Sequence, residues 1–289
     1  MSQSKTQTKR TSLRLPALKG DCAVQFALAK CYDFDKPKDK RRAIYWYKKA
    51  AAQGHAEAQN FLGESYRDGW SVAKDINAAI KWYRLAADQN QPDAQLSLGY
   101  LYFYGEGVAK DAKMALEWYR KAAKNGNDGA MCNIGHMYRR GDVVKQSWHE
   151  AIKWYKKAVN GNRYGNNVAA MHWLGRIYDG LEEFPEDQKS AVYWLTKASE
   201  HGDAQSQSLL GVHYYHGEGV PQDFKSAAKL YRLRAMQGDT WSQYLLGLCY
   251  RDGDGVKRNK RWALHWFDKA SVDTSEANKA ANSLRKLSL

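Results

Sequence analysis

Residues 92–127 read PDAQLSLGYLYFYGEGVAKDAKMALEWYRKAAKNGN. Apolar residues recur in this stretch at helical spacing, in one stripe before a glycine-rich turn and a second stripe after it. The stripes are Ala94, Leu98 and Tyr102, and then Ala115, Trp118, Tyr119 and Ala122. The turn between them, Tyr104-Gly-Glu-Gly-Val108, supplies the glycines that a helix C-terminus with positive φ requires. The stretch therefore predicts two helices joined by a short turn.

The same pattern recurs along the chain in steps of 36 residues, with one step of 40. One series of landmarks is Trp46, Trp82, Trp118, Trp154, Trp194, Leu230 and Trp266, each with Ala three residues before it. A second series is Gly63, Gly99, Gly135, Gly175, Gly211 and Gly247, each preceded by Leu or Ile and followed three residues later by Tyr. The longer step places an insertion around 162–167. The sequence is therefore a tandem repeat of helix pairs.

Each repeated residue type has a physical role in such a unit. Glycine within a helix costs about 1 kcal/mol relative to alanine, so its recurrence needs a close helix–helix contact as compensation. An aspartate at the start of the second helix suits an N-cap, as at Asp75, Asp111, Asp187 and Asp223. One helix pair cannot bury such an aromatic face alone, so we expect the repeats to stack into a solenoid.

These residues resemble the SEL-one-like repeat family, a branch of the tetratricopeptide-like solenoids. The match runs from Ala94-Gln95-x-x-Leu98-Gly99-x-x-Tyr102 through Trp118-Tyr119-x-Lys121-Ala122-Ala123. The resemblance implies an all-α fold, a right-handed α-solenoid (α/α superhelix) of about seven 36-residue helix-turn-helix repeats over residues 22–273. We expect a flexible basic N-terminal arm at 1–21 and a C-terminal capping helix at 274–289. Residues 22–55 depart from the motif because Ala29 replaces its Gly, and 168–203 depart because Leu181-Glu-Glu-Phe184-Pro185 replaces the glycine-rich turn.

The charge of the chain is concentrated near its start. The 289 residues carry 45 Lys and Arg against 31 Asp and Glu, a net charge of +14. Residues 1–55 account for 13 basic and 4 acidic residues, and hence for +9 of that total. A nucleic-acid protein is expected to carry a basic track along its length, which this chain lacks. The charge distribution favours a solvated surface first and the docking of an acidic protein second, with nucleic acid or lipid as the remaining alternative.

Neither the cysteines nor the histidines form a known catalytic or metal-binding motif. Cys22, Cys31, Cys132 and Cys249 are irregularly spaced and lack metal-ligand spacing. His213 and His216 stand three residues apart, but register places His213 in the interior and His216 at a turn. No nucleophile elbow, zinc-protease motif, phosphate loop or Cys–His arrangement is recognisable. The sequence therefore predicts no enzyme activity, no cofactor, no metal and no small-molecule substrate. It also lacks a signal-peptide pattern and an apolar run of membrane length, which favours a cytoplasmic protein.

The resemblance implies that partners bind along the concave face, which is lined by the first helix of each pair. The exposed positions there lie two residues before the Leu landmark and two and five residues after it. The predicted partner-binding residues at these positions are Asn60, Glu64, Arg67, Leu96, Tyr100, Phe103, His136, Arg139, His172, Arg176, Tyr215, Tyr244 and Arg251. Because these positions differ between repeats while their neighbours stay fixed, they indicate a surface specific to one partner, although unconstrained drift gives the same pattern. Tyr, Phe, Arg and His are also typical of interface hot spots.

Together these features predict a non-enzymatic protein-interaction module or adaptor whose partner is a protein with an acidic surface. By resemblance, bacterial members of the family also serve as host-interaction factors and as immunity proteins that neutralise a toxin by direct binding. An immunity or inhibitor role is thus the first alternative. A basic protein that binds nucleic acid is the alternative from a different class, and a cryptic hydrolase is a further one.

Overall fold

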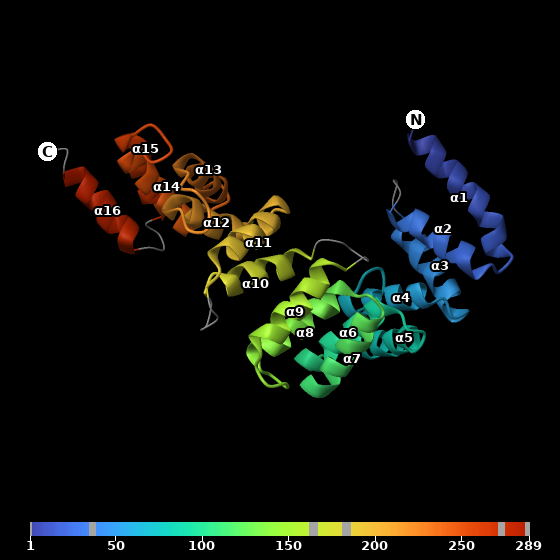
Figure 1. The fold of residues 1–289 in the computed structure, drawn as a ribbon. Helices are drawn as coiled ribbons and strands as arrows, with labels where there is room; N and C mark the ends of the chain where they lie inside the picture. The colour runs from blue at the N-terminus through green and yellow to red at the C-terminus, as the bar shows by residue number, and fades with distance from the viewer. Residues whose placement is uncertain (1, 35–38, 162–166, 181–185, 271–274, 287–289) are drawn as a thin grey trace. The chain divides into compact units, whose positions relative to one another are not determined.

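A computed structural model describes residues 2–34, 39–161, 167–180, 186–270 and 275–286. Every regular element in these ranges is a helix (Figure 1). The helices are α1 (Ser2–Leu18), α2 (Cys22–Phe34), α3 (Lys40–Ala52), α4 (Ala56–Asp68), α5 (Ile76–Asp88), α6 (Pro92–Tyr104), α7 (Ala112–Lys124), α8 (Asp128–Arg140), α9 (Trp148–Val159), α10 (Val168–Tyr178), α11 (Gln188–Glu200), α12 (Ala204–His216), α13 (Phe224–Ala235), α14 (Thr240–Asp252), α15 (Lys260–Ala270) and α16 (Ser275–Lys286). The all-α solenoid predicted from the sequence is confirmed.

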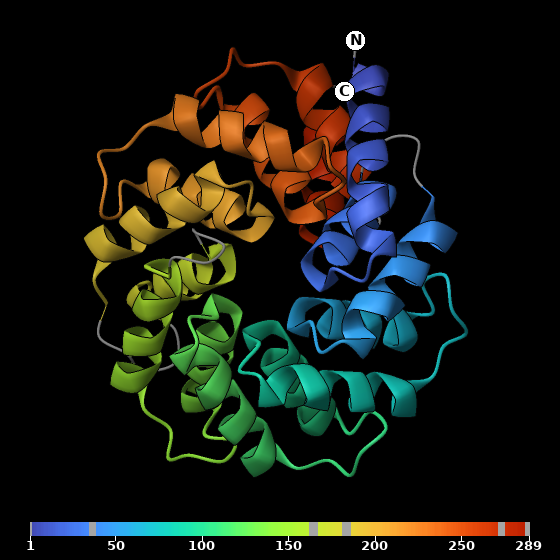
Figure 2. The same cartoon turned by 90° about the vertical axis from the view of Figure 1, so that its right-hand side faces the viewer.

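The helices divide into two compact units. The N-terminal unit spans residues 1–165 and the C-terminal unit spans 166–289. Within each unit every helix packs on the one before and the one after it, so chain order is also spatial order (Figures 1 and 2). The predicted insertion at 162–167 falls almost entirely on residues 162–166, outside the described ranges, as does the departure at 181–185.

The repeated glycine is explained by a contact inside each helix pair. A Cβ atom added to Gly99 in α6 would lie 2.3 Å from Cε1 of Tyr119 in α7. The corresponding tyrosines, or Leu195 and Phe267 in repeats 5 and 7, meet the other landmark glycines at 2.5–2.7 Å in the same way. The ring of Tyr119 is only 2 % exposed. The glycine thus lets the second helix press its large side chain against the first helix, and the pair buries its core.

Caps fix where the helices begin and end. Asp75, Asp111 and Asp223 accept hydrogen bonds from backbone N–H groups of the first turn of α5, α7 and α13, as the sequence predicted, and Asp187 does so for α11. In the turn after α6, Gly105 and Gly107 have φ of +78° and +69°, a conformation that favours glycine. These local signals therefore set the length of each helix before tertiary packing acts.

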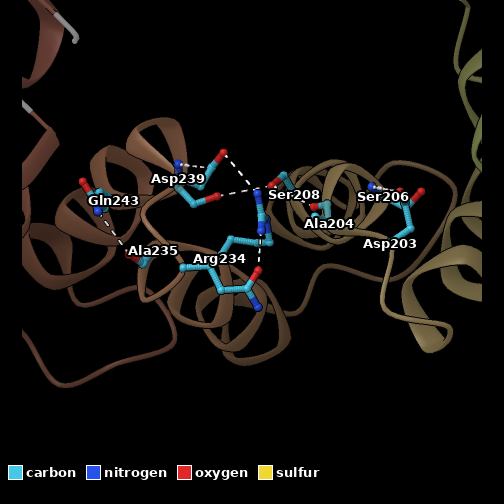
Figure 3. Close-up of polar contacts among 10 residues, drawn as sticks. Asp203, Ala204, Ser206, Ser208, Arg234, Ala235, Asp239 and Gln243 are labelled. Carbon is cyan, nitrogen blue, oxygen red and sulfur yellow. Dashed lines mark hydrogen bonds and ion pairs between the residues drawn. The ribbon is translucent and has the colours of Figure 1, made fainter. Parts of the chain in front are cut away.

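In five of the seven repeats, a glutamine joins the repeat to the helix before it. Gln95 Nε2 donates to the Ala87 carbonyl at the end of α5, and Gln95 Oε1 accepts from Asn125 Nδ2 at 2.8 Å. Figure 3 shows the equivalent contact in the C-terminal unit, where Gln243 of α14 donates to the Ala235 carbonyl of α13 at 3.1 Å. The glutamine gives a second donor to a carbonyl at a helix C-terminus that also accepts a backbone N–H, as Ala87 does from Asn90 and Ala235 does from Gly238. It therefore works as a clamp between neighbouring helix pairs.

The segment expected to be a flexible arm is helical in the structure. The guanidinium of Arg10 in α1 donates to the Cys31 carbonyl at 2.6 and 3.2 Å, and Ala17 is 1 % exposed. Gln25 of α2 donates to the Ala17 carbonyl at 2.9 Å, which is the same clamp that Gln95 makes with α5. Where the sequence predicts a flexible arm, the structure has α1 in the place of a preceding second helix, packed on the first repeat.

At the other end, α16 packs on α15 through Ala277, Ala281 and Leu284. Among the described residues, no helix is both long enough and apolar enough to cross a membrane. Within the described part of the chain none of the four cysteines forms a disulfide, and three of them are buried.

Candidate functional site

The conserved spacing of each first helix decides which of its side chains remain available for binding. Leu62, Leu98, Ile134 and Leu174 are at most 1 % exposed, because they face the second helix of their pair. The positions two residues before the landmark and two and five after it form what we call the first-helix face. Its residues are described separately for each unit below.

In the N-terminal unit, the face of α2 and α4 contains a hollow of about 260 Å³. Asn60 and Glu64 line it together with aromatic rings from both helices, among them Phe26 and Phe61. Phe61 stacks on Tyr47 with 3.8 Å between ring centroids. A second hollow of about 350 Å³ shares Phe34, Phe61 and Glu64 with the first and also reaches Trp70. The structure thus brings Asn60 and Glu64 to one aromatic cavity.

Two polar groups of this cavity lack a full set of partners. Asn60 Nδ2 donates to Glu64 Oε1 at 3.0 Å, but Asn60 Oδ1 is buried and has no hydrogen-bond partner among the described residues. Burial raises the pKa of Glu64, and the hydrogen bond from Asn60 and the nearby charge of Arg67 oppose that effect only in part. Arg67 lies one turn further along but is paired with Asp68 at 2.8 Å. The carboxylate of Glu64 is therefore costly to ionise without an added donor or cation.

The next part of the face, on α6 and α8, is a small aromatic patch. Tyr100 and Phe103 line a hollow of about 70 Å³ together with His136. Tyr100 is 37 % exposed, and its ring stacks on Tyr104 with 6.3 Å between centroids. Leu96 is half-buried beside this patch and packs against the core of the third and fourth repeats. Tyr100, Phe103 and His136, chosen from sequence spacing, therefore lie together.

The sequence analysis recognised no Cys–His arrangement, and the structure corrects this on α8. Cys132 Sγ lies 3.6 Å from His136 Nε2, and His136 Nδ1 lies 2.7 Å from the hydroxyl of Tyr155. Burial, reinforced by Asp128, raises the pKa of the Cys132 thiol to about 12. Burial, reinforced by Arg139 and Arg140, lowers the pKa of His136 to about 4. Both shifts oppose a thiolate–imidazolium pair, so this geometry is unsuited to cysteine nucleophilic catalysis.

Arg139 is less accessible than the sequence pattern implied. It is only 9 % exposed and interacts with the hydroxyl of Tyr155. Its side chain therefore serves the packing of α8 on α9.

In the C-terminal unit the same face is closed by contacts between repeats. His172 of α10 is 5 % exposed, and its Nδ1 lies 2.9 Å from Ser206 Oγ and 3.1 Å from Asp203 Oδ1. Asp179, just after α10, meets His213 of α12 at 3.2 Å. His213 is buried as register predicted, and its Nδ1 lies 3.0 Å from the Glu218 carbonyl. These contacts join α10 to α12 rather than opening a cavity.

The pKa values of His172 and His213 are shifted in opposite directions. Burial lowers the pKa of His172, with Arg176 adding to that effect and Asp203 opposing it. Burial also acts to lower the pKa of His213, but the hydrogen bonds to Asp179 and Glu218 outweigh it and raise the pKa. Arg176 itself is half-buried and lies over the ring of Trp173 at 5.5 Å.

Further along this unit the face residues also have internal partners. The Tyr215 hydroxyl donates to Asp254 at 2.7 Å, and Arg251 pairs with Asp252. The ring of Tyr244 lies 5.9 Å from that of Phe267. Ser208 and Ser242 join α12 to α14 at 3.3 Å.

Repeat 6 differs from the others at one buried position. Arg234 stands where Ala50, Ala86, Ala122, Ala158, Ala198 and Ala270 are fully buried in the other repeats. Leu230, four residues earlier, replaces the larger Trp. Figure 3 shows Arg234 turned toward Asp239, 3.5 Å away, and the Arg234 side chain is 14 % exposed. The smaller Leu and the larger Arg thus replace the Trp and Ala of the common pattern together.

Sequence reasoning missed the contribution of the first repeat to the face. Phe26, Lys30 and Asp33 occupy the three face positions when they are counted from Leu28. They were overlooked because Ala29 stands where the landmark Gly is expected. Phe26 and Lys30 line the first hollow and Asp33 lines the second. The spacing from Leu28 alone would have identified them.

On the outer surface, lysine ammonium groups lie over tryptophan rings. Lys121 lies 4.1 Å above the ring of Trp118, and Lys157 lies 4.2 Å above that of Trp154. These pairs sit on the second helices, where the sequence predicted solvated lysines. In the described part of the chain, no group of three or more His, Cys, Asp or Glu residues is arranged to hold a metal ion.

Comparison with known proteins identifies the repeat. The Sel1 repeat pattern matches seven segments, residues 23–55, 56–91, 92–127, 129–162, 168–203, 204–239 and 242–271. The chain is similar to a protective antigen of uropathogenic Escherichia coli with an SLR fold, at 28% identity and a TM-score of 0.71 over 95% of this chain and 67% of that one. It is also similar to a Sel1 repeat protein from Oxalobacter formigenes, at 29% identity and a TM-score of 0.68 over 88% and 96% of the two chains. No curated protein gives a significant match. With seven matches over most of its length, the chain belongs to the Sel1 repeat family.

Proposed function

We propose that this protein is a non-enzymatic interaction module that binds a partner protein along the first-helix face. The observation that carries the proposal is the contrast between fixed and variable positions within one helix. Leu98 and Gly99 are repeated and buried, whereas Tyr100 is exposed and differs from its counterparts Glu64 and His136. A position required by the framework would keep its residue type, so the variable positions are free to be selected for a partner.

The chemistry of the N-terminal unit supports this choice. Aromatic rings with partly open hollows and a few polar groups resemble the centres of protein interfaces, where Tyr, Trp and Arg supply most of the affinity. The unfavourable protonation states of Cys132 and His136 argue against hydrolase chemistry on this face. We propose two narrower roles within this function, an immunity protein that neutralises a toxin and an adaptor in an assembly. We also propose that the protein is cytoplasmic. The acidic partner surface expected from the +9 charge of residues 1–55 also belongs to the proposal.

The test is capture of the partner by full-length protein and by a face variant. Bait is exposed to native lysate at low salt and at about 0.5 M salt, where exposed charge pairs are largely screened. We expect one dominant protein to survive high salt, and Tyr100→Ala to weaken its binding by about 2 kcal/mol or more. Tyr193→Ala is the matched control, since Tyr193 is 53% exposed on the second helix α11.

Two results would contradict the proposal. Equal capture by wild type and Tyr100→Ala would remove this face from the interface. Recovery of only nucleic acid and ribosomal proteins, all lost at high salt, would make the net charge the source of binding. Mass spectrometry of the captured protein would separate the adaptor from the immunity role, because a toxin would be recognised as such.

A further inference from the structure

We propose that the hollow between α2 and α4 is a subsite for an arginine side chain of the partner, with Glu64 and Asn60 as its acceptors. This inference rests on the proposed function and adds the chemistry of one partner residue. It concerns the cavity of about 260 Å³ that Phe26, Phe61, Asn60 and Glu64 line. Pockets for free small ligands usually measure about 300–1,000 Å³, so this size suits one side chain better than a whole cofactor.

In the part of the chain that the structure describes, one buried acceptor of this cavity, on Asn60, lacks a hydrogen-bond donor. Asn60 is 8 % exposed, and its Oδ1 is buried without a hydrogen-bond partner among the described residues. The side-chain amide cannot be turned to avoid this, because its Nδ2 donates to Glu64 Oε1 at 3.0 Å and turning it would set two acceptors against each other. A buried acceptor without a partner is costly, so the cavity favours a ligand that brings N–H groups.

The residues that line the cavity carry more negative than positive charge. Within the described part of the chain, Glu64 forms no ion pair with a lysine or arginine. Glu57 and Asp93 line the same hollow, whereas the adjoining one is lined by Asp33 and by Lys40. Lys30 is at the wall but holds its ammonium 5.5 Å from the centre of the Phe26 ring. Burial already raises the pKa of Glu64, so an incoming cation would relieve a penalty that the folded protein carries.

Aromatic rings form part of the cavity wall. Phe26 and Phe61 line the hollow, and Phe34, which is 62 % exposed, stands at the junction with the second hollow. A guanidinium stacks on aromatic faces and still donates in its own plane, which a compact ammonium does less well. Arginine therefore fits the combination of rings, carboxylate and amide oxygen better than lysine does.

The positive charge of residues 1–55 does not oppose this assignment at contact range. Charges farther than about 8 Å are largely screened at physiological salt, whereas Glu64 would touch the ligand. The basic surface would therefore contact acidic groups elsewhere on the partner, and the hollow would contact one arginine within that partner.

The experiment uses the full-length protein and a defined probe. N-acetyl-arginine methylamide is titrated by NMR, with the side-chain amide signals of Asn60 as the readout and the neutral citrulline analogue as the ligand control. We expect saturable binding of the arginine compound that shifts the Asn60 signals, and at least tenfold weaker binding of citrulline. Glu64→Gln should weaken arginine binding at least tenfold, because it keeps the shape but removes the charge.

Two further variants keep the result interpretable if the cavity is disturbed. Phe34→Ala removes an exposed ring and should weaken arginine binding about threefold without affecting folding. Glu117→Gln, on the exposed side of α7, is the matched charge control and should leave binding unchanged. Equal binding of arginine and citrulline, or of Glu64→Gln and wild type, would overturn the assignment, as would a lysine analogue that binds more tightly than the arginine compound.

The outcomes separate this inference from the proposed function. If a partner is captured in a Tyr100-dependent way but binds Glu64→Gln as tightly as wild type, the arginine subsite is wrong and the interaction module stands. If the arginine probe binds at Asn60 and Glu64 but no partner depends on Tyr100, the cavity assignment stands and the proposed function fails.

Discussion

The same register position performs different tasks in the two units. Asn60 in α4 and His172 in α10 both stand two residues before the Leu landmark, and both are buried. Among the described residues, the hydrogen bond from the Asn60 side chain stays within its own helix, at Glu64, and leaves an acceptor in a cavity, whereas His172 reaches Asp203 and Ser206 of the next repeat. The first arrangement leaves polar capacity for a ligand, and the second uses it to fasten neighbouring repeats. One scaffold position can thus serve recognition or cohesion, depending on the side chain that occupies it.

The largest expected effect is a loss of stability when the landmark glycine is replaced, and its size should differ between the two units. Gly99→Ala should destabilise α6–α7 by about 2 kcal/mol, because the new Cβ would meet the buried ring of Tyr119 and overpack the pair. Gly175→Ala should cost less, about 1 kcal/mol, because its Cβ would meet mainly the flexible side chain of Leu195 and would come no closer than 3.3 Å to the Leu195 backbone nitrogen. Amide hydrogen exchange measures both local opening energies.

The replacement Tyr119→Leu sharpens this test, because it gives repeat 3 the large-residue type of repeat 5. In that background Gly99→Ala should cost about as much as Gly175→Ala. Equal costs for the two single variants would show that the ring is not what the glycine accommodates.

A second contrast is the response of the N-terminal unit to acid. The folded pKa of His136 is about 4, below its ordinary value of 6.5, so between those pH values the unfolded chain binds more protons than the folded chain. Stability is therefore lost as the pH falls through this window. His136→Gln should flatten the dependence, as followed by exchange in α8 and α9. A curve with the same slope in wild type and variant would contradict the assignment.

The C-terminal unit should respond in the opposite sense at Asp179. Because the folded pKa of His213 is raised, the stability from its pairing is fully present below pH 6.5 and is lost as the pH rises through the folded value. Asp179→Asn should therefore destabilise α10–α12 by about 1 kcal/mol at pH 5.5 and by less at pH 8.5. Urea unfolding at the two pH values measures this, and a larger cost at the higher pH would refute the pairing as the cause.

The smallest effect concerns the glutamine clamp, which the two units share only in part. Met131 and Met171 stand in repeats 4 and 5 where Gln95 stands in repeat 3. Gln95→Met should cost about 1 kcal/mol, since it loses the bonds to Ala87 and Asn125 but keeps a residue that neighbouring repeats tolerate. Exchange at the end of α5 should rise, and unchanged protection there would mean that the clamp contributes no stability.

Several features of this face illustrate how far spacing alone can lead. Counting from the Leu landmark placed Tyr100, Phe103 and His136 in one patch, and the same count from Leu28 would have added Phe26 to the cavity of Asn60 and Glu64. Spacing failed at Arg139, because its long side chain folds back against Tyr155 instead of pointing outward. It also gave no sign that α1 is helical, since its docking depends on Arg10 and Gln25 bonding to carbonyls at the ends of other helices.

The repeat, the helix boundaries and the buried glycine contacts follow from the order of the amino acids, because 3.6-residue periodicity, capping residues and side-chain size fix them. Which face residues stay open depends on how neighbouring repeats pack. Whether Asn60 keeps a free acceptor or His172 finds Asp203 depends on atoms that repeat packing brings together from more than 30 residues away. Local sequence features therefore specify the helical scaffold, and the packing between repeats determines which face residues remain available for binding.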